Sequence, residues 1–336
     1  MIFKNNGNIV ENLGDIRLFV EAANLGGLSA AGRKLGLSPA AASARLVKLE
    51  TSLHTRLFER TTRQLRLTEE GRIYLLHCQQ ALQSLEDAHA ALHAGRSIVR
   101  GKVRISATSD FGRHVLKGWL DEFNVQYPEV TLALILSDSL SNLLFDDIDL
   151  AIRFGVPPDS SLVARRLGPN RRVLCASPEY VTTHGVPERP QDLERFDCII
   201  LATASGPAND WRFTRGGEVE TYTVPLANAR ETNDGALARE WAVAGYGIAM
   251  KSVWDIASDL RTGKLTILMP EWRSPDVPVH ALYQRSRYMA PRVRALLDFL
   301  VERSTAMSHD LDAYLNSGAG VAERGGARNS RLPGET

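Results

Sequence analysis

Short helical segments joined by tight turns near the start of the chain constrain its fold more than any other feature of the sequence. The first segment carries Leu18, and the second runs from Ser29 to Leu35. Gly36 then supplies a turn, and a third segment begins at Pro39. Proline suits the first position of a helix, where its missing N–H costs nothing, and the oxygen of Ser38 can accept from free amides there. The pattern predicts a helix-turn-helix arrangement.

The third helix has one apolar face and one face of small and basic residues. Ala42, Leu46 and Leu49 follow the i, i+4, i+7 spacing of an inward face. Small outward residues let a helix approach the bases in the major groove of DNA, where Ser43 could meet base edges or phosphates and Arg45 could bind guanine. A pair of alanine-rich helices inside a protein core is the alternative. The candidate DNA contacts of the helical segments are Ser29, Arg33, Ser38, Pro39, Ala40, Ala41, Ser43, Arg45 and Lys48.

A polar hairpin is expected after these helices. Leu57 and Phe58 are candidate core residues, and a polar, basic stretch then returns to Leu67. Such a hairpin beside a recognition helix forms a wing that can place Arg60 and Arg63 along a phosphate backbone or in a minor groove. We therefore expect a winged helix-turn-helix domain over residues 1–67.

Positive charge gathers in this part of the chain. The whole sequence has 40 basic and 39 acidic residues, a formal net charge of +1. Residues 29 to 66, however, hold eight basic side chains against two acidic ones. A local basic patch of this kind is typical of phosphate binding, although a solvated surface would look the same.

A long helix is predicted for residues 69–94, within a linker over residues 68–96. Thr68 can cap it, and acidic Glu69 and Glu70 suit its first turn. Apolar residues recur at alternating spacings of three and four, as in a coiled coil. A single helix packed on its own domain is the alternative. The candidate dimerisation residues are Leu75, Cys78, Leu82, Leu85 and Leu92.

From Gly101 onward, predicted strands and helices alternate. Two such series, ending with a helix from Pro291 to about Arg303, predict parallel-rich sheets covered by helices. Their length suggests an α/β domain over residues 101–303 with two lobes and a cleft between them. The tail over residues 304–336 is rich in small and polar residues, and we expect it to be disordered, at least beyond Leu315.

The sequence resembles the LysR-type transcriptional regulators. The resemblance rests on the amino-terminal segments LFVEAANLGGLSAAGRKLGLSPAAASARLVKLE and TRLFERTTRQLRLTEEG, and later on DLAIRFG, SSLVARRLGPNRRVLCASPEY, AGYGIAMKS and PRVRALLDFL. It covers about residues 12 to 303. Two positions depart from the family pattern. Ala44 stands where many relatives have a longer polar residue, and His54 replaces a usual glycine, which affects the expected geometry of that turn.

The resemblance implies a two-lobed effector domain like the periplasmic binding proteins, with a small molecule between the lobes. It also implies homodimers through the linker helix, commonly paired into tetramers, that bind double-stranded promoter DNA. RNA polymerase is a further partner implied by the family, and no cofactor is implied.

Candidate effector contacts follow from the residues themselves. Thr108, Ser109 and Asp110 follow a strand and open a helix, where hydroxyls and free amides suit an anion such as a carboxylate. Asp110 would oppose an acid unless it caps the helix and turns away. Arg153 could offset it as a ligand clamp, or belong to a structural ion pair. Asn233 and Asp234, at the start of a helix in the second lobe, could face the cleft or only cap that helix.

Other function classes find little support. The sequence contains no GxSxG, GxxxxGK[ST] or HExxH motif, and its three cysteines have no metal-ligand spacing. We therefore expect neither an enzyme nor a metal site. A solute-binding receptor would fit the second half alone, but we find no export signal. No apolar run reaches the roughly 18 residues of a membrane span. A cytoplasmic protein without a membrane partner is the expectation.

Overall fold

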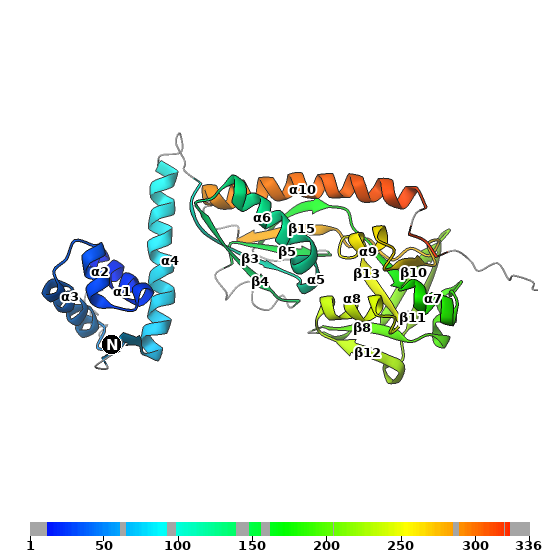
Figure 1. Ribbon diagram of the computed structural model, residues 1–336, viewed down its shortest axis with the longest axis horizontal. Helices are drawn as coiled ribbons and strands as arrows, with labels where there is room; N and C mark the ends of the chain where they lie inside the picture. Colours follow the sequence, from blue (N-terminus) through cyan, green and yellow to red (C-terminus); the bar gives the residue numbers. More distant parts are fainter. Residues whose placement is uncertain are drawn as a thin grey trace, which may run out of the picture. The chain divides into compact units, whose positions relative to one another are not determined.

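The structure is a computed structural model that describes residues 12–60, 65–92, 99–138, 148–155, 162–203, 205–284, 289–318 and 320–322. The chain forms two compact units, Met1–Ser97 and Ile98–Thr336. Each unit is described by itself below (Figure 1).

The first unit is a bundle of helices with a small hairpin. Its elements are α1 (Leu13–Leu25), α2 (Leu28–Lys34), α3 (Pro39–Ser52), β1 (Phe58–Arg60), β2 (Leu65–Leu67) and α4 (Glu69–Leu92). The Ser38 hydroxyl accepts from the amide of Ala41 at 3.2 Å, which confirms the predicted cap. Ala42, Leu46 and Leu49 are buried, so the inward face of α3 is also confirmed.

The hairpin follows its prediction as well. β1 and β2 pair antiparallel, with Phe58 opposite Leu67. Leu57 and Phe58 are buried in the core of this unit, as expected. Residues 61–64, and Arg63 with them, lie outside the described residues, as does the side chain of Arg60.

Helix α4 begins as predicted but packs differently. The Thr68 hydroxyl caps it by accepting from the amide of Gly71 at 2.9 Å. Cys78 is buried in the core of the unit, and Leu75 and Leu82 pack against that core. These three residues therefore pack on the helix's own domain, which was the alternative, because an apolar stripe that suits a partner helix also suits that domain. Their role in dimerisation stays a prediction.

Helix α4 also has apolar side chains that are exposed to solvent. Leu85, another predicted dimerisation residue, is exposed, and so are Ile73 and Leu76. The side chain of Leu92 lies outside the described residues.

The second unit contains two lobes. Lobe I is built on a five-stranded sheet of order β4-β3-β5-β15-β6. Its elements are β3 (Gly101–Ala107), α5 (Ser109–Phe111), the π-helical η2 (Gly112–Leu116), α6 (Lys117–Gln126), β4 (Val130–Leu136), β5 (Leu150–Phe154), β6 (Leu162–Gly168), β15 (Val279–Gln284) and α10 (Pro291–Asn316).

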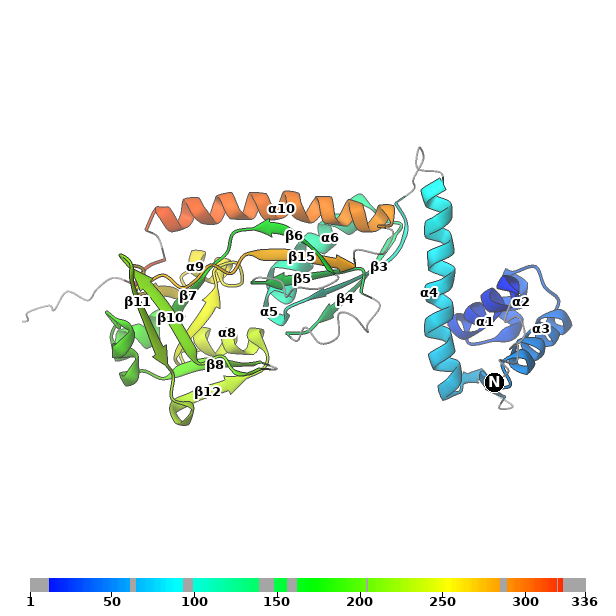
Figure 2. The same cartoon turned by 180° about the vertical axis from the view of Figure 1, so that it is seen from behind.

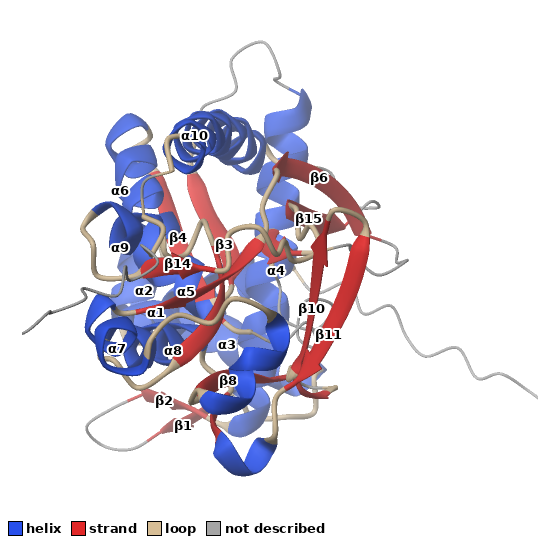
Figure 3. Cartoon of the chain, turned by 90° about the vertical axis from the view of Figure 1, so that its right-hand side faces the viewer, coloured by secondary structure: helices blue, strands red, loops and turns tan. Residues whose placement is uncertain are grey.

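Lobe II is built on a second sheet, whose main path has the order β12-β8-β13-β7-β14. The hairpin β10–β11 stands at one side of this lobe (Figure 3). The elements of lobe II are β7 (Arg172–Ala176), α7 (Pro178–His184), η3 (Pro190–Arg195), β8 (Cys198–Thr203), β9 (Gly206–Pro207), β10 (Asp210–Arg215), β11 (Glu218–Thr223), η4 (Leu226–Asn228), β12 (Ala229–Thr232), α8 (Gly235–Val243), β13 (Ile248–Ser252), α9 (Ala257–Arg261) and β14 (Thr266–Leu268).

Both sheets are mixed. In lobe I, β3 pairs parallel with β4 and β5, whereas β15 pairs antiparallel with β5 and β6. In lobe II, β8 pairs parallel with β12 and β13, whereas β7 pairs antiparallel with β13 and β14. The expectation of parallel-rich sheets therefore holds for only one side of each sheet. The chain enters lobe II after β6 and returns to lobe I at β15.

Helix α10 corrects the predicted end of the domain. It continues to Asn316 instead of ending near Arg303, and Leu311 is buried at 3% exposure. The expectation of disorder from residue 304 is therefore wrong as far as Asn316. It is also wrong at Gly320–Ala322, because the amide of Ile267 in β14 donates to the Gly320 carbonyl at 2.7 Å. Residues 323–336 lie outside the described residues.

Helix α10 contacts both lobes. Val293, Leu296 and Leu300 lie in the core of lobe I. Farther along, the Tyr314 hydroxyl donates to the carbonyl of Leu260 in α9 at 2.8 Å. Figure 2 shows the helix running along both lobes from behind.

Candidate nucleic-acid interface and interlobe cavity

The outer face of α3 is accessible in the first unit. Ala40, Ala44 and Lys48 are exposed, and Ala41 and Ser43 are half-buried. Ala40 and Ala41 lie in the first turn of the helix, where small side chains leave the backbone open to a close partner. On the neighbouring helix α2, Ser29 and Arg33 are exposed as well. The predicted contact residues of the two helices are thus on the surface, whereas the hydroxyl of Ser38 is used in the cap.

Arg45 has a partner that the sequence did not suggest. Its Nε lies 3.7 Å from Oδ1 of Asp15, a largely buried carboxylate in α1, while the Arg45 side chain is 42% exposed. This ion pair connects α3 to α1. Arg45 is therefore held on the domain surface and shares its charge with Asp15.

The basic patch is only partly available. Lys34 pairs with Glu21 at 2.8 Å, which neutralises one of its charges. Arg33, Lys48 and Arg56 are exposed. These three side chains leave a positive surface around α2, α3 and the hairpin.

A cavity of about 300 Å³ lies between the two lobes of the second unit. Thr108, Asp110 and Arg153 line it from lobe I, so the structure brings three predicted effector residues together. Ser109, Asn233 and Asp234 border a more open hollow that shares Asp138 and Thr203 with the cavity. The lobe II lining includes Arg172, Ile199, Ile200, Leu201, Trp211, Gly235, Ala249, Met250, Lys251 and Asp255.

Asp110 is a buried ion-pair partner, not a helix cap. It is 2% exposed and pairs with Lys251 of β13, across the two lobes. Its Oδ1 is also hydrogen-bonded to Nδ1 of His114 at 2.8 Å, and this bond raises the pKa of His114. The predicted capping role of Asp110 is therefore wrong. Lys251 was missed; its only signal is a lysine in the apolar strand pattern IAMKS.

Arg153, which was expected to offset the charge of Asp110, is hydrogen-bonded to other groups instead. Its Nη2 donates to the Ser106 hydroxyl at 2.7 Å and its Nη1 to the Ile152 carbonyl at 2.8 Å. Burial lowers its pKa to about 10, so it stays charged at neutral pH. Its Nε and the Thr108 hydroxyl are buried without a hydrogen-bond partner among the described residues. Two residues that line the cavity therefore each have a buried polar atom without a hydrogen-bond partner in the described part of the chain.

Asp255 adds an acidic group to the same wall. Its Oδ1 is buried without a hydrogen-bond partner in the described part of the chain. Burial, with the neighbouring Asp110 carboxylate, raises the pKa of Asp255 to about 8. Burial thus favours the protonated form of Asp255, which can donate a hydrogen bond.

The anion position predicted at Ser109 is occupied by the chain itself. Its amide donates to Oδ1 of Asp138 at 2.8 Å, and its hydroxyl to Oδ2 at 2.6 Å. In lobe II, Asp234 caps α8 by accepting from the amide of Ala236 at 2.8 Å. Capping was one of the two roles that the sequence suggested for this residue. Asp234 also pairs with Arg113 of lobe I at 3.0 Å. Asn233 is exposed.

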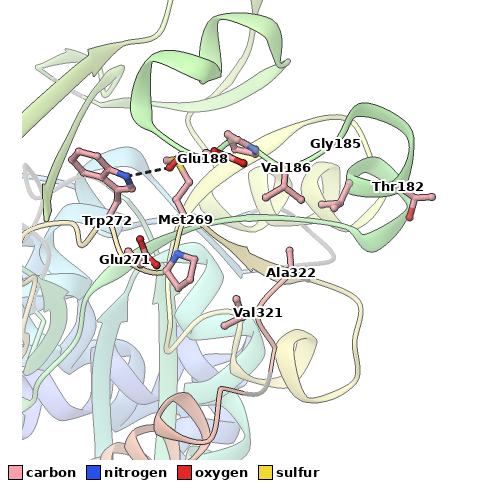
Figure 4. A pocket seen from close by; sticks show the side chains of 12 residues that line it. Thr182, Gly185, Val186, Glu188, Met269, Glu271, Trp272, Val321 and Ala322 are labelled. Carbon is pink, nitrogen blue, oxygen red and sulfur yellow. Dashed lines mark hydrogen bonds between the residues drawn. The ribbon is translucent and has the colours of Figure 1, made fainter. Parts of the chain in front are cut away.

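Another pocket, of about 680 Å³, lies in lobe II (Figure 4). Val186, Met269 and Trp272 line it, together with Val321 and Ala322 from the segment after α10. Nε1 of Trp272 donates to the Glu188 carbonyl at 3.2 Å. None of the predicted effector residues lines this pocket.

Two properties concern other kinds of site. In the described part of the chain, no group of three or more histidine, cysteine or acidic side chains is placed to hold a metal ion. No described helix combines the length and the apolar character that a membrane span needs.

Comparison with protein families gives two matches. Residues 13–72 match the model described as "Bacterial regulatory helix-turn-helix protein, lysR family". Residues 97–305 match the "LysR substrate binding domain". The HTH-type transcriptional regulator DmlR of Escherichia coli is 33% identical over 86% of this chain and 93% of its own length.

Solved structures agree with this comparison. CrgA from Neisseria meningitidis, a LysR-type transcriptional regulator, has a TM-score of 0.57 and 31% identity, covering 87% of this chain and 99% of its own. The full-length Vibrio cholerae virulence activator AphB has a TM-score of 0.54 and 26% identity, with the same coverages of 87% and 99%.

Proposed function

The chain belongs to the LysR family of bacterial transcriptional regulators, and from this premise we propose which residues carry its two binding functions. It is a sequence-specific DNA-binding regulator with an amino-terminal helix-turn-helix and a carboxy-terminal effector-binding domain. The assignment of residues to DNA and effector is our own.

We propose that the outer face of α3 enters the major groove of promoter DNA. The observation that carries this proposal is the accessible small-residue surface at the start of α3, beside exposed Lys48. Ala40, Ala41 and Ser43 are assigned to base edges, and Lys48 and Arg33 to phosphates. Ser29, Pro39 and the hairpin residues Arg60 and Arg63 complete the proposed contacts. Arg45 contributes from its ion pair with Asp15.

A gel-shift titration of the promoter fragment upstream of the gene tests this assignment. Ala40→Glu places a negative charge on the proposed DNA face, where an acid in the first helical turn does not harm folding. Its affinity should fall at least about tenfold, because the new negative charge would lie in a groove bordered by the phosphates of both strands. Val125→Glu is the matched control, since Val125 is exposed in the second unit. Equal affinities of the two variants would refute the assignment.

We propose that the effector is a small carboxylate bound in the interlobe cavity. The observation that carries this proposal is that two residues lining the cavity, Arg153 and Thr108, each have a buried polar atom, Nε and the hydroxyl, without a hydrogen-bond partner among the described residues. A buried guanidinium N–H suits a carboxylate oxygen, and the 300 Å³ cavity fits a small molecule. Protonated Asp255 would donate to the same ligand.

Calorimetric titration with a panel of small carboxylates tests the cavity. The acid that binds the wild-type protein should bind Thr108→Val and Arg153→Lys at least about tenfold more weakly, because each loses one hydrogen bond to a charged group. Unchanged affinity in both variants would place the effector elsewhere.

Family membership also suggests an oligomeric state, a protein partner and a cellular compartment. We propose a homodimer through the exposed apolar side of α4, with dimers pairing into tetramers. We further propose that the DNA-bound protein contacts RNA polymerase in the cytoplasm.

A further inference from the structure

Asp138 joins the two lobes through one carboxylate. It lies just after β4 in lobe I, next to the start of α5. Oδ1 accepts from the Ser109 amide at 2.8 Å, and Oδ2 accepts from the Ser109 hydroxyl at 2.6 Å. Oδ2 also accepts from the amide of Gly235, the first residue of α8 in lobe II, at 3.0 Å. Both oxygens of the carboxylate are therefore used, and one of them reaches across the cleft.

Neighbouring contacts close the same junction. The amide of Ala236 donates to the Ser109 hydroxyl at 3.4 Å, and the Arg113–Asp234 ion pair lies beside it. The beginning of α8 thus faces the beginning of α5, and the Asp138 carboxylate lies between them. Its hydrogen-bond donors are two backbone amides and one hydroxyl, all neutral. Any carboxylate of similar size could satisfy the same three donors.

Asp138 also borders the interlobe cavity, together with Asp110 and Arg153. A carboxylate in the cavity therefore has Asp138 among its neighbours. Two carboxylates cannot share the same three donors, because their like charges repel at this distance and there are too few N–H and O–H groups.

We propose that Asp138 is an intramolecular latch, a built-in carboxylate that holds the lobes together without effector and that the effector's carboxylate replaces. This inference rests on the proposed effector function and adds its regulation. When an effector held at Arg153 and Thr108 by one carboxylate presents a second carboxylate to the donors of Ser109 and Gly235, Asp138 is released, and the contact between the lobes then runs through the bound molecule. The response of the protein is set by the competition between an internal and an external carboxylate.

Removal and chemical replacement of the Asp138 carboxylate test the latch in the full-length protein. In Asp138→Ala, hydrogen exchange of the Gly235 amide should rise roughly ten- to a hundredfold, because this amide loses its bond to a charged acceptor. Sodium formate, the smallest carboxylate, should fill the vacated space and restore slow exchange. Sodium chloride at the same concentration should not, and formate should leave the wild-type exchange unchanged.

Asp149→Ala is the matched control. Its carboxylate also accepts from a backbone amide, that of Arg104 at 2.9 Å, but both residues belong to lobe I. Its loss should leave the exchange of Gly235 unchanged. Wild-type exchange at Gly235 in Asp138→Ala, or fast exchange that formate does not slow, would overturn the latch.

A second variant covers the case in which Asp138→Ala does not fold. Asp138→Asn keeps the shape but replaces one accepting oxygen by an NH₂ group that faces donors. The exchange of Gly235 should then rise by an intermediate amount, and formate should have no effect, because the space stays filled. Exchange equal to wild type in this variant would also overturn the proposal.

DNA binding separates failure of the latch from failure of the proposed function. Asp138→Ala should still shift the promoter fragment, because the change lies in the second unit. If the wild-type protein binds the fragment and a carboxylate but formate fails to rescue Asp138→Ala, only the latch is refuted. If the wild-type protein binds no carboxylate while formate rescues the variant, the effector assignment fails and the interlobe contact remains.

Discussion

His54 stores backbone strain in the first unit. It adopts a left-handed conformation with φ of 51°, at the position where the family pattern has glycine. A side chain in this region costs roughly 1–2 kcal/mol, part of which glycine returns as greater freedom in the unfolded chain. Since the His54 side chain is exposed, its burial offsets little of this cost.

We therefore expect His54→Gly to stabilise the first unit by up to about 1 kcal/mol. Hydrogen exchange of the core amides of α3 should slow up to about fivefold. His54→Ala is the control, because it removes the imidazole but keeps the strained backbone. Equal exchange in both variants would show that the imidazole, not the backbone, sets the stability.

Asp255 makes the stability of the second unit depend on pH. Its pKa of about 8 in the folded protein lies above the roughly 3.9 of an unfolded aspartate. The folded state therefore binds the proton more tightly, and this contribution to stability is present at low pH and is lost as pH rises toward 8. In Asp255→Asn, the free energy of unfolding should fall less between pH 5 and pH 8 than in the wild-type protein.

Urea unfolding followed by tryptophan fluorescence measures this effect. All five tryptophans lie in the second unit, so the signal reports on that unit alone. The same pH slope in wild type and Asp255→Asn would contradict the assignment.

Residue roles that depend on sequence neighbours were predictable, and those that depend on the other lobe were not. The caps at Ser38 and Thr68 follow from the residues beside them. By contrast, Asp110 meets Lys251 and Asp138 meets Gly235 only because the chain returns from lobe II. No local sequence pattern predicts contacts between residues of different lobes.

At the scale of elements, α4 shows the limit of periodicity. Its spacing predicted a helix, and the helix forms, but the same spacing cannot tell which surface covers it. Leu75, Cys78 and Leu82 pack in their own unit. Ile73 and Leu76, which lie outside the predicted seam, are exposed.

A substitution on each side of α4 separates the two surfaces. Leu76→Lys should convert the dimer to a monomer, because a buried lysine at the interface would lose its hydration. Sedimentation velocity measures this change. Leu82→Lys should instead destabilise the first unit, which faster exchange in α1 would report. A dimer that survives Leu76→Lys would contradict the proposed interface.

At the scale of the whole molecule, the alternation of strands and helices predicted the α/β class and the two lobes. It did not predict that each sheet is mixed, because strand direction depends on where the chain crosses between lobes. Helix α10 shows the same limit. Its continuation to Asn316 is stabilised by contacts with α9 that lie far away in the sequence.

The central claim for the whole molecule is that the start of α3 lies in the major groove of promoter DNA. An iron chelate that cleaves DNA, attached to Ala40→Cys, tests it most directly. Cys78, Cys175 and Cys198 are all buried, so the label should attach mainly to the new thiol. Strand cuts should cluster where the major groove of the bound site faces the protein. Cleavage no greater than from a chelate on Val125→Cys, with the DNA still bound, would contradict it.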